Sequence, residues 1–269
     1  MKLPYIFIFD IDQCIVGNVR HLTNETVIFR DLQEHYGKIT NYKSNFDQDM
    51  KNGLLRPGFI DFIHCIKKRF APCELFLYTN SSYNWTNTML VPTIEKATKI
   101  KFNKPYFTRE SSILLKKSLD EVYEKIFPIL QKKYKIPLKH KDFIINNNLL
   151  FIDNIKDNTS THTNRQITCP EYDHCPYRCP YENMLSVFGT DIIWTENVEK
   201  KIFNKTNIEY YNPYSDKILI KDKIIYNTNK LLKIRDAELL NEKYKDDNFY
   251  LTLCDKLTDL TDKTIANIK

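Results

Sequence analysis

Glycine is scarce in this chain, with only 5 among 269 residues. Neither GxGxxG nor GxxxxGK[ST] occurs, and both motifs hold phosphate groups on a glycine-rich loop. The sequence therefore argues against a nucleotide-binding loop of either kind.

Long apolar runs are also missing. The N-terminal run 6–9 is interrupted by Asp10 and Asp12, which makes it too short for a signal peptide or a membrane span. No other stretch approaches the roughly 18 apolar residues that a spanning helix needs. We therefore expect a soluble, intracellular protein with no membrane partner, and the sequence does not distinguish nucleus from cytoplasm.

Cysteine and charge place further bounds on the protein. Seven cysteines, an odd number without a secretion signal, are expected to be mostly reduced thiols or metal ligands. The net charge of +6 predicts a solvated, lysine-rich surface, with a basic face for nucleic acid or phosphorylated protein as the alternative. A chain of this length can bury a full hydrophobic core, as one elaborated domain or as a core with a large insertion.

Three short apolar runs each end on residues that carry oxygen. They are Ile6-Phe7-Ile8-Phe9 before Asp10-Ile11-Asp12, Leu75-Phe76-Leu77-Tyr78 before Thr79-Asn80-Ser81, and Leu149-Leu150-Phe151-Ile152 before Asp153-Asn154. Continuous apolar runs are typical of strands that are buried on both faces of a parallel sheet.

Two helical patterns lie between these runs. Pro57 can open a helix whose residues Phe59, Ile63, Ile66 and Phe70 share one face. Residues 118–121 form a capping box for a second helix, which Pro128 would kink or shorten. Alternating strands and helices predict an α/β fold, in which ligands bind beyond the carboxyl ends of the strands.

The polar residues at the three strand ends should therefore meet in one crevice. Asp10, Asp12 and Asp153 would repel one another there, because two unit charges about 4 Å apart cost roughly 4 kcal/mol at an effective dielectric of about 20. A magnesium ion would relieve this repulsion. One carboxylate could attack phosphorus while another manages the leaving-group proton, and the Thr79 hydroxyl could hold a phosphate oxygen. Each residue alone is equally a cap or a turn residue, whereas their common position favours phosphoryl transfer.

The same segments resemble the motifs of a known family. IFIFDIDQCIV resembles the DxDx[TV] motif of the haloacid dehalogenase (HAD) superfamily, in its FCP/SCP-type C-terminal-domain phosphatase branch (NLI-interacting-factor-like). The chain also resembles the later motifs of this branch, in order, at LRPGFIDFI, LFLYTNSS, FTRESSILLKKSL, LLFIDN and DDNFYLTLCDKLTDL. The resemblance implies a HAD-like, Rossmannoid three-layer fold with a parallel central sheet. We expect a catalytic core at 1–157, an insertion subdomain at 158–234 and a closing helical part at 235–269.

The resemblance also implies roles for the residues after the first two strands. Asp10 would be the nucleophile and a magnesium ligand. Asp12 would act first as general acid and then as base, and its carbonyl would bind the metal. Thr79 and Asn80 would bind the phosphoryl group.

Further roles fall on residues later in the chain. Lys117 would neutralise the charge of phosphate and of Asp10, with Lys116 as the alternative and a solvated surface charge as the simpler interpretation of either. Asn154 would ligate magnesium, with Asp153 beside it as a ligand or a supporting residue. Arg56 is expected to make a structural contact. Asp157 is either a fourth acid or a solvated loop residue.

The chain departs from the family pattern at two places. Cys14 stands where the family has Thr or Val, and we expect it to be a packing substitution. About 80 residues separate Asn154 from the closing helix, where the family has a short connection, and residues 218–226 within them suggest a hairpin.

This insertion carries a cluster of cysteines. Cys169, His174, Cys175 and Cys179 lie within eleven residues and could hold a structural zinc ion, although their spacing matches no standard finger. The alternatives are reduced, partly buried cysteines and an exposed redox-sensitive cluster. His162 and His174 could overhang the crevice or simply be packing residues.

The leading hypothesis is a magnesium-dependent phosphatase that hydrolyses phosphomonoesters through an aspartyl-phosphate on Asp10. A phosphoserine or phosphothreonine protein or peptide is the favoured substrate, because no large cap is expected between Asp12 and Thr79. A polynucleotide 3′-phosphatase or nucleotidase is the first alternative, with nucleic acid as a less favoured partner. A non-catalytic binding module on a phosphatase scaffold is the second.

Overall fold

The computed structural model describes residues 2–17, 19, 46–111, 116–174 and 244–268. The chain divides into two units, of which the first comprises Met1–Gly17, Asp47–His174 and Tyr244–Lys269. The second comprises Asn18–Phe46 and Cys175–Lys243. The sheet and all the predicted magnesium and phosphate residues belong to the first unit.

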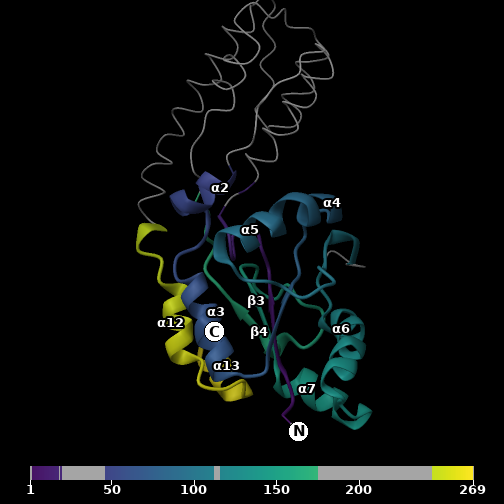
Figure 1. Ribbon diagram of the computed structural model, residues 1–269. Coiled ribbons are helices and arrows are strands. Elements are labelled where there is room, and N and C mark those ends of the chain that lie inside the picture. The colour runs from purple at the N-terminus through teal and green to yellow at the C-terminus, as the bar shows by residue number, and fades with distance from the viewer. Residues whose placement is uncertain (1, 18, 20–45, 112–115, 175–243, 269) are drawn as a thin grey trace, which may run out of the picture. The chain divides into compact units, whose positions relative to one another are not determined.

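A parallel sheet of four strands forms the centre of this unit, in the order β2-β1-β3-β4. Strands β3 and β4 are labelled in Figure 1. The strands are β1 (Tyr5–Phe9), β2 (Cys73–Leu77), β3 (Leu149–Asp153) and β4 (Gln166–Thr168). In the register, Phe7 lies between Leu75 of β2 and Leu150 of β3. The three predicted strands and the α/β class are therefore confirmed.

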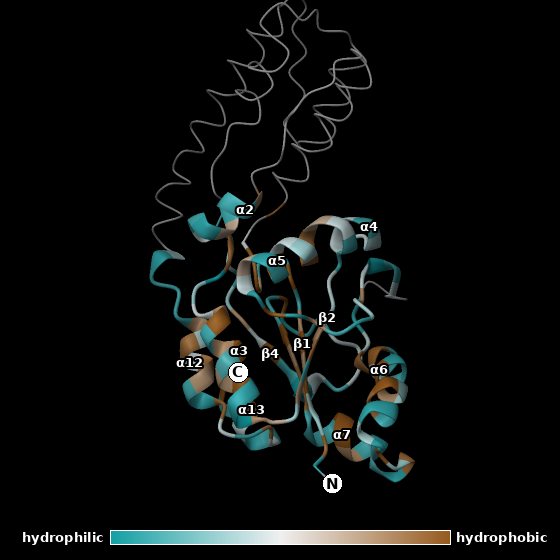
Figure 2. Cartoon of the chain, viewed as in Figure 1, coloured by the Kyte–Doolittle hydropathy of each residue, from teal (hydrophilic) through white to brown (hydrophobic). Residues whose placement is uncertain are grey.

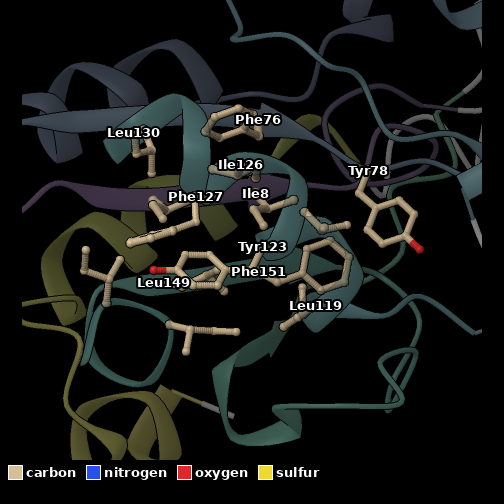
Figure 3. Packing of buried hydrophobic residues seen from close by; sticks show 14 of the residues in the cluster. Ile8, Phe76, Tyr78, Leu119, Tyr123, Ile126, Phe127, Leu130, Leu149 and Phe151 are labelled. Carbon is tan, nitrogen blue, oxygen red and sulfur yellow. The ribbon is translucent and has the colours of Figure 1, made fainter. Parts of the chain in front are cut away.

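The two faces of the sheet are covered by different helices, because successive side chains of a strand point to opposite faces. Ile6 and Ile8 of β1 pack into a cluster with α6 (Leu119–Tyr134) and α7 (Lys141–Asn147) (Figure 3). The rings of Phe9 and Phe59 lie 5.6 Å apart on the other face, where α3 (Phe59–Arg69) packs. The result is the three-layer α/β arrangement that the sequence predicts.

Helices α3 and α6 follow their predicted patterns. Phe59, Ile63 and Ile66 are buried in α3, and the hydrophobic colour of the inward faces is visible in Figure 2. The Ser118 hydroxyl caps α6 by accepting from the Glu121 backbone N–H at 3.3 Å. Pro128 lies inside α6 without shortening it, since the helix continues to Tyr134.

Gly58 has a structural reason to be glycine. It precedes α3 with φ 73°, a left-handed conformation that L side chains rarely adopt. A Cβ at this position would also lie 2.9 Å from Leu251 Cγ in α12 (Phe249–Lys256). The glycine of the RPG segment therefore lets α12 approach the start of α3 closely.

A disulfide between Cys65 and Cys254 also joins α3 to α12. The expectation of reduced thiols fails for this pair and holds for Cys14, Cys73 and Cys169. No local sequence pattern indicates this bond, because its two cysteines are 189 residues apart.

The core continues further along the chain than the predicted boundary at residue 157. β4 pairs with β3, so the segment up to His174 belongs to the first unit. Residues 18–46 instead group with 175–243. The predicted hairpin at 218–226 lies outside the described residues, whereas the closing helical part contains α12 and α13 (Asp262–Ile268).

The remaining helices among the described residues are short. They are α2 (Phe46–Asp49), α4 (Tyr83–Trp85) and α5 (Val91–Thr98), with further helical turns at Met50–Leu54, Thr86–Leu90, Arg109–Ser111, Leu138–His140 and Thr163–Arg165. Within the described part of the chain, no helix is long and apolar enough to cross a membrane.

Candidate active site

A buried cluster of charges lies at the carboxyl ends of the two central strands. Asp10 follows β1 and Asp153 ends β3, and the Lys117 ammonium donates to both. Lys117 Nζ is 2.5 Å from Asp10 Oδ1 and 2.8 Å from Asp153 Oδ2. Asp10 has an exposed fraction of 5%, and Lys117 and Asp153 each have 0%. Because the cluster is buried, water screens its charges little.

The backbone on both sides of Lys117 determines where its side chain lies. Its N–H donates to Asn158 O at 2.9 Å, and its carbonyl accepts from Ser160 N–H at 2.9 Å. Its ammonium lies 5.4 Å from the ring centroid of Tyr78 and 5.1 Å from that of Phe151. Lys116, the alternative lysine, is exposed. Lys117 is therefore the lysine that the fold brings to Asp10.

The site brings three carboxyl groups together with one ammonium group. Burial raises the pKa of Asp10 to about 8, although the ammonium of Lys117 lowers it, and the carboxylates of Asp153 and Asp12 raise it further. Burial lowers the pKa of Lys117, but the two adjacent carboxylates outweigh that effect and hold this pKa above its ordinary value. When all three carboxylates are ionised, one ammonium leaves two negative charges uncompensated.

Asp12 lies beside the end of β2. Its Oδ2 accepts hydrogen bonds from Thr79 Oγ1 and from Ser81 Oγ, both at 2.9 Å. A tight turn follows Asp12, in which Gln13 has φ 58° and Ile15 N–H donates to Ile11 O at 3.0 Å. This turn leaves the Asp12 side chain half-buried beside the two hydroxyls.

Asp153 is held by its own loop as well as by Lys117. Its Oδ2 also accepts from Asn158 Nδ2 at 2.8 Å, and its Oδ1 accepts from Ile155 N–H at 2.7 Å. Asn154 is the next residue and is half-buried. Asn80 is half-buried between Thr79 and Ser81, and its carbonyl accepts from Arg109 Nε at 2.9 Å.

Sequence reasoning missed Ser81 and Asn158. Ser81 stands in the same hydroxyl-bearing segment as Thr79, two residues later, and that spacing was a usable signal. Asn158 follows Asp153 by five residues in an irregular loop, where no periodicity indicates which side chain turns inward. Its contact with Asp153 is visible only in the folded chain.

Two residues of the predicted zinc cluster, Cys169 and His174, are among the described residues. Cys169 is buried with its Sγ 3.5 Å from Cys14 Sγ, and His174 Nε2 lies 3.1 Å from Asn52 O. Cys175 and Cys179 lie outside the described residues. No group of three or more His, Cys, Asp or Glu residues suited to a metal ion is found in the described part of the chain. Zinc binding stays a prediction.

The other candidate residues make structural contacts. The Arg56 guanidinium is buried and donates from Nε and Nη2 to Asp247 at 3.0 and 2.8 Å, which is the kind of contact expected for it. Cys14 is buried, with its Sγ 3.5 Å from the Tyr250 hydroxyl. His162 Nε2 lies 2.7 Å from Asp120 Oδ1. Asp157 is exposed.

Comparisons with known proteins were made at three levels. No family model matches the chain, and no curated protein matches it. Among solved structures, the chain is similar to the fission yeast RNA polymerase II CTD phosphatase Fcp1, in a variant bound to beryllium fluoride, with a TM-score of 0.39 and 15% identity. That match covers 99% of this chain and 67% of the other.

A second structure of Fcp1, described as an essential RNA polymerase II CTD phosphatase, matches with a TM-score of 0.35 and 15% identity. It covers 94% of this chain and 63% of the other. The chain thus spans roughly two thirds of these structures. Both TM-scores are below 0.5, so the chemical interpretation of the site rests on its own residues.

Proposed function

We propose that the protein is a phosphatase that hydrolyses phosphate monoesters with Asp10 as its nucleophile. One observation carries the proposal: the buried contact of Lys117 with both Asp10 and Asp153 at the strand ends. A structural ion pair needs one acid for one base, whereas this lysine holds two buried acids. Such an excess of acids costs stability and suits a site that receives positive charge and a phosphoryl group.

The proposed reaction has two steps. An Asp10 carboxylate oxygen attacks phosphorus, the bond from phosphorus to the leaving oxygen breaks, and Asp12 gives that oxygen its proton. Water then attacks the phosphorus of the aspartyl-phosphate while Asp12 takes up a proton, which releases phosphate and restores the Asp10 carboxylate. Thr79 would donate its hydroxyl to a phosphoryl oxygen, and Lys117 would balance the charge of Asp10.

The donor set fits a magnesium ion, because two negative charges in the site lack a cation. Asp10, the Asp12 carbonyl and Asn154 would hold the ion, which supplies positive charge to the phosphoryl oxygens when bound. The two oxygens of Asp153 already accept three hydrogen bonds from Lys117, Asn158 and Ile155. Asp153 therefore suits an orienting role beside the metal.

We further propose phosphoserine or phosphothreonine in an extended peptide as the substrate. This step rests on the resemblance of the motifs to those of the FCP/SCP-type phosphatases. The binding-module alternative expects the loss of a central residue. Here Lys117 contacts both Asp10 and Asp153, and Asp12 contacts Thr79, which argues against it.

Release of phosphate from three substrates tests the proposal. The purified chain is incubated with p-nitrophenyl phosphate, a phosphoserine peptide and a 3′-phosphate oligonucleotide, each with magnesium and with chelator. Magnesium-dependent hydrolysis of the first two supports the proposal, and preference for the oligonucleotide would identify the polynucleotide alternative instead. No hydrolysis of any of them by folded protein would contradict it. Lys116→Ala, which changes the exposed neighbour of Lys117, is the control that should retain activity.

A further inference from the structure

Asp12 Oδ2 is unusual in accepting hydrogen bonds from two hydroxyl groups at once. Thr79 Oγ1 and Ser81 Oγ both lie 2.9 Å from this one oxygen. The proposed reaction gives Thr79 a task of its own at the phosphoryl group and leaves Ser81 without one. The second hydroxyl therefore needs an explanation.

A hydroxyl has one proton to donate. When Thr79 donates to a phosphoryl oxygen, as proposed above, it can no longer donate to Asp12. Ser81 then becomes the hydroxyl that still holds the Asp12 carboxyl group. Asp12 must be held most accurately at that moment, because proton transfer needs the acid within hydrogen-bond distance of the leaving oxygen.

The backbone around Ser81 is fixed by a neighbouring segment. Thr79 N–H donates to Phe107 O at 2.9 Å, and Arg109 N–H donates to Ser81 O at 3.1 Å. Arg109 Nε also donates to Asn80 O, and Ser81 N–H donates to Thr79 Oγ1 at 3.1 Å. The contacts of Arg109 with Asn80 and Ser81 hold this backbone independently of the Thr79 proton, so the Ser81 hydroxyl can stay directed at Asp12 when Thr79 donates elsewhere.

We propose that Ser81 is a positioning residue that orients Asp12 as the proton donor for the leaving group, an inference that rests on the proposed function. Because Oδ2 accepts from Ser81, the transferable proton sits on the other oxygen, Oδ1. In the first step the Oδ1–H bond breaks and its proton joins the leaving oxygen, which keeps the electron pair of the broken bond to phosphorus. In the second step Oδ1 takes a proton back from the attacking water.

The leaving group provides the test. p-Nitrophenolate leaves with little help from an acid, whereas phenolate, a stronger base, needs its oxygen protonated. Ser81→Ala is expected to lower kcat/KM for phenyl phosphate by about 10-fold or more, within the roughly 100- to 10,000-fold that general acid catalysis contributes. The loss for p-nitrophenyl phosphate should stay below about threefold. Both kcat/KM values are measured on one preparation, so the ratio between the two substrates does not depend on the fraction of protein that is folded.

Three further variants complete the experiment. Ser81→Thr keeps a hydroxyl and should restore the ratio between the two substrates. Ser82→Ala makes the same change one residue later, where the side chain makes no capping bond to α4, and should leave the ratio unchanged. In an Asp12→Asn background, Ser81→Ala should change the ratio no further, because residues that act through one another are not additive.

The outcomes separate this inference from the proposed function. If the unmodified protein hydrolyses neither substrate, the proposed phosphatase activity is contradicted, and the assignment of Ser81 fails with it. If it hydrolyses both but Ser81→Ala lowers the two rates equally, the phosphatase stands and the positioning role is overturned.

Discussion

Among individual residues, Lys117 is a buried lysine that contacts two carboxyl groups. Its ammonium lies among buried carboxylates and aromatic rings, with an exposed fraction of 0%. A buried ion pair contributes little net stability compared with apolar residues, but removing one partner is costly because the other charge stays buried. The lysine therefore matters to stability as well as to the proposed chemistry.

Replacing Lys117 by methionine tests whether this lysine stabilises the folded protein. Lys117→Met is expected to lower the free energy of unfolding by about 3 to 5 kcal/mol, since Asp10 and Asp153 lose their cation. Urea unfolding without magnesium measures the change. Lys116→Met, the same substitution at an exposed neighbour, should stay within about 0.5 kcal/mol of the unmodified protein. Equal effects of the two substitutions would show that Lys117 is not held as described.

At this scale the sequence identifies the acids better than their partners. Asp10, Asp12 and Asp153 could be picked out because each stands at or just beyond the end of an apolar run. The contact of Lys117 follows from its position before a recognisable helix cap. Ser81 stands beside Thr79 in the hydroxyl-bearing segment, which is a usable signal, whereas Asn158 lies in an irregular loop and its contact with Asp153 depends on how that loop folds.

Among the elements, α3 and α12 are joined by more than apolar packing. Arg56 lies just before α3 and binds Asp247, which lies just before α12. The same guanidinium donates to the carbonyl oxygens of Cys14 and Pro170 at 3.4 and 2.9 Å. One buried side chain thus connects the loop after β1, the segment after β4 and the start of α12.

Removing this guanidinium should loosen all three attachments. Arg56→Met is expected to lower the free energy of unfolding by about 3 kcal/mol or more, because Asp247 and two carbonyl groups lose their donor. Asp247→Asn combined with Arg56→Met should cost less than the sum of the two single effects. Lys67→Met on the exposed face of α3 is the control, measured by the same urea unfolding. Strict additivity of Arg56 and Asp247 would contradict the contact.

The disulfide between Cys65 and Cys254 makes a second prediction at this scale. Reduction is expected to lower the free energy of unfolding by about 2 to 4 kcal/mol, because the bond restricts the unfolded chain. Cys65→Ser should abolish the response to reductant, whereas Cys73→Ser, at a free half-buried cysteine, should retain it. Labelling of Cys65 and Cys254 by a thiol reagent in unfolded, unreduced protein would show that the bond does not form.

For the whole molecule, the layered α/β core was predictable and its boundaries were not. The three main strands are continuous apolar runs, and α3 and α6 carry apolar faces with caps, so local pattern and buried position agree. β4 has only three residues, Gln166–Thr168, too few to show a period. The grouping of 18–46 with 175–243 joins segments that are distant in sequence, and no local pattern reports that association.

Asp10 is proposed above as the nucleophile of a phosphatase. Magnesium-dependent hydrolysis of p-nitrophenyl phosphate by the unmodified protein and by Asp10→Asn tests this role, with circular dichroism to show that both proteins are folded. We expect turnover by the unmodified protein and none above background by the variant, because the amide cannot attack phosphorus. Undiminished turnover by a folded Asp10→Asn protein would contradict it.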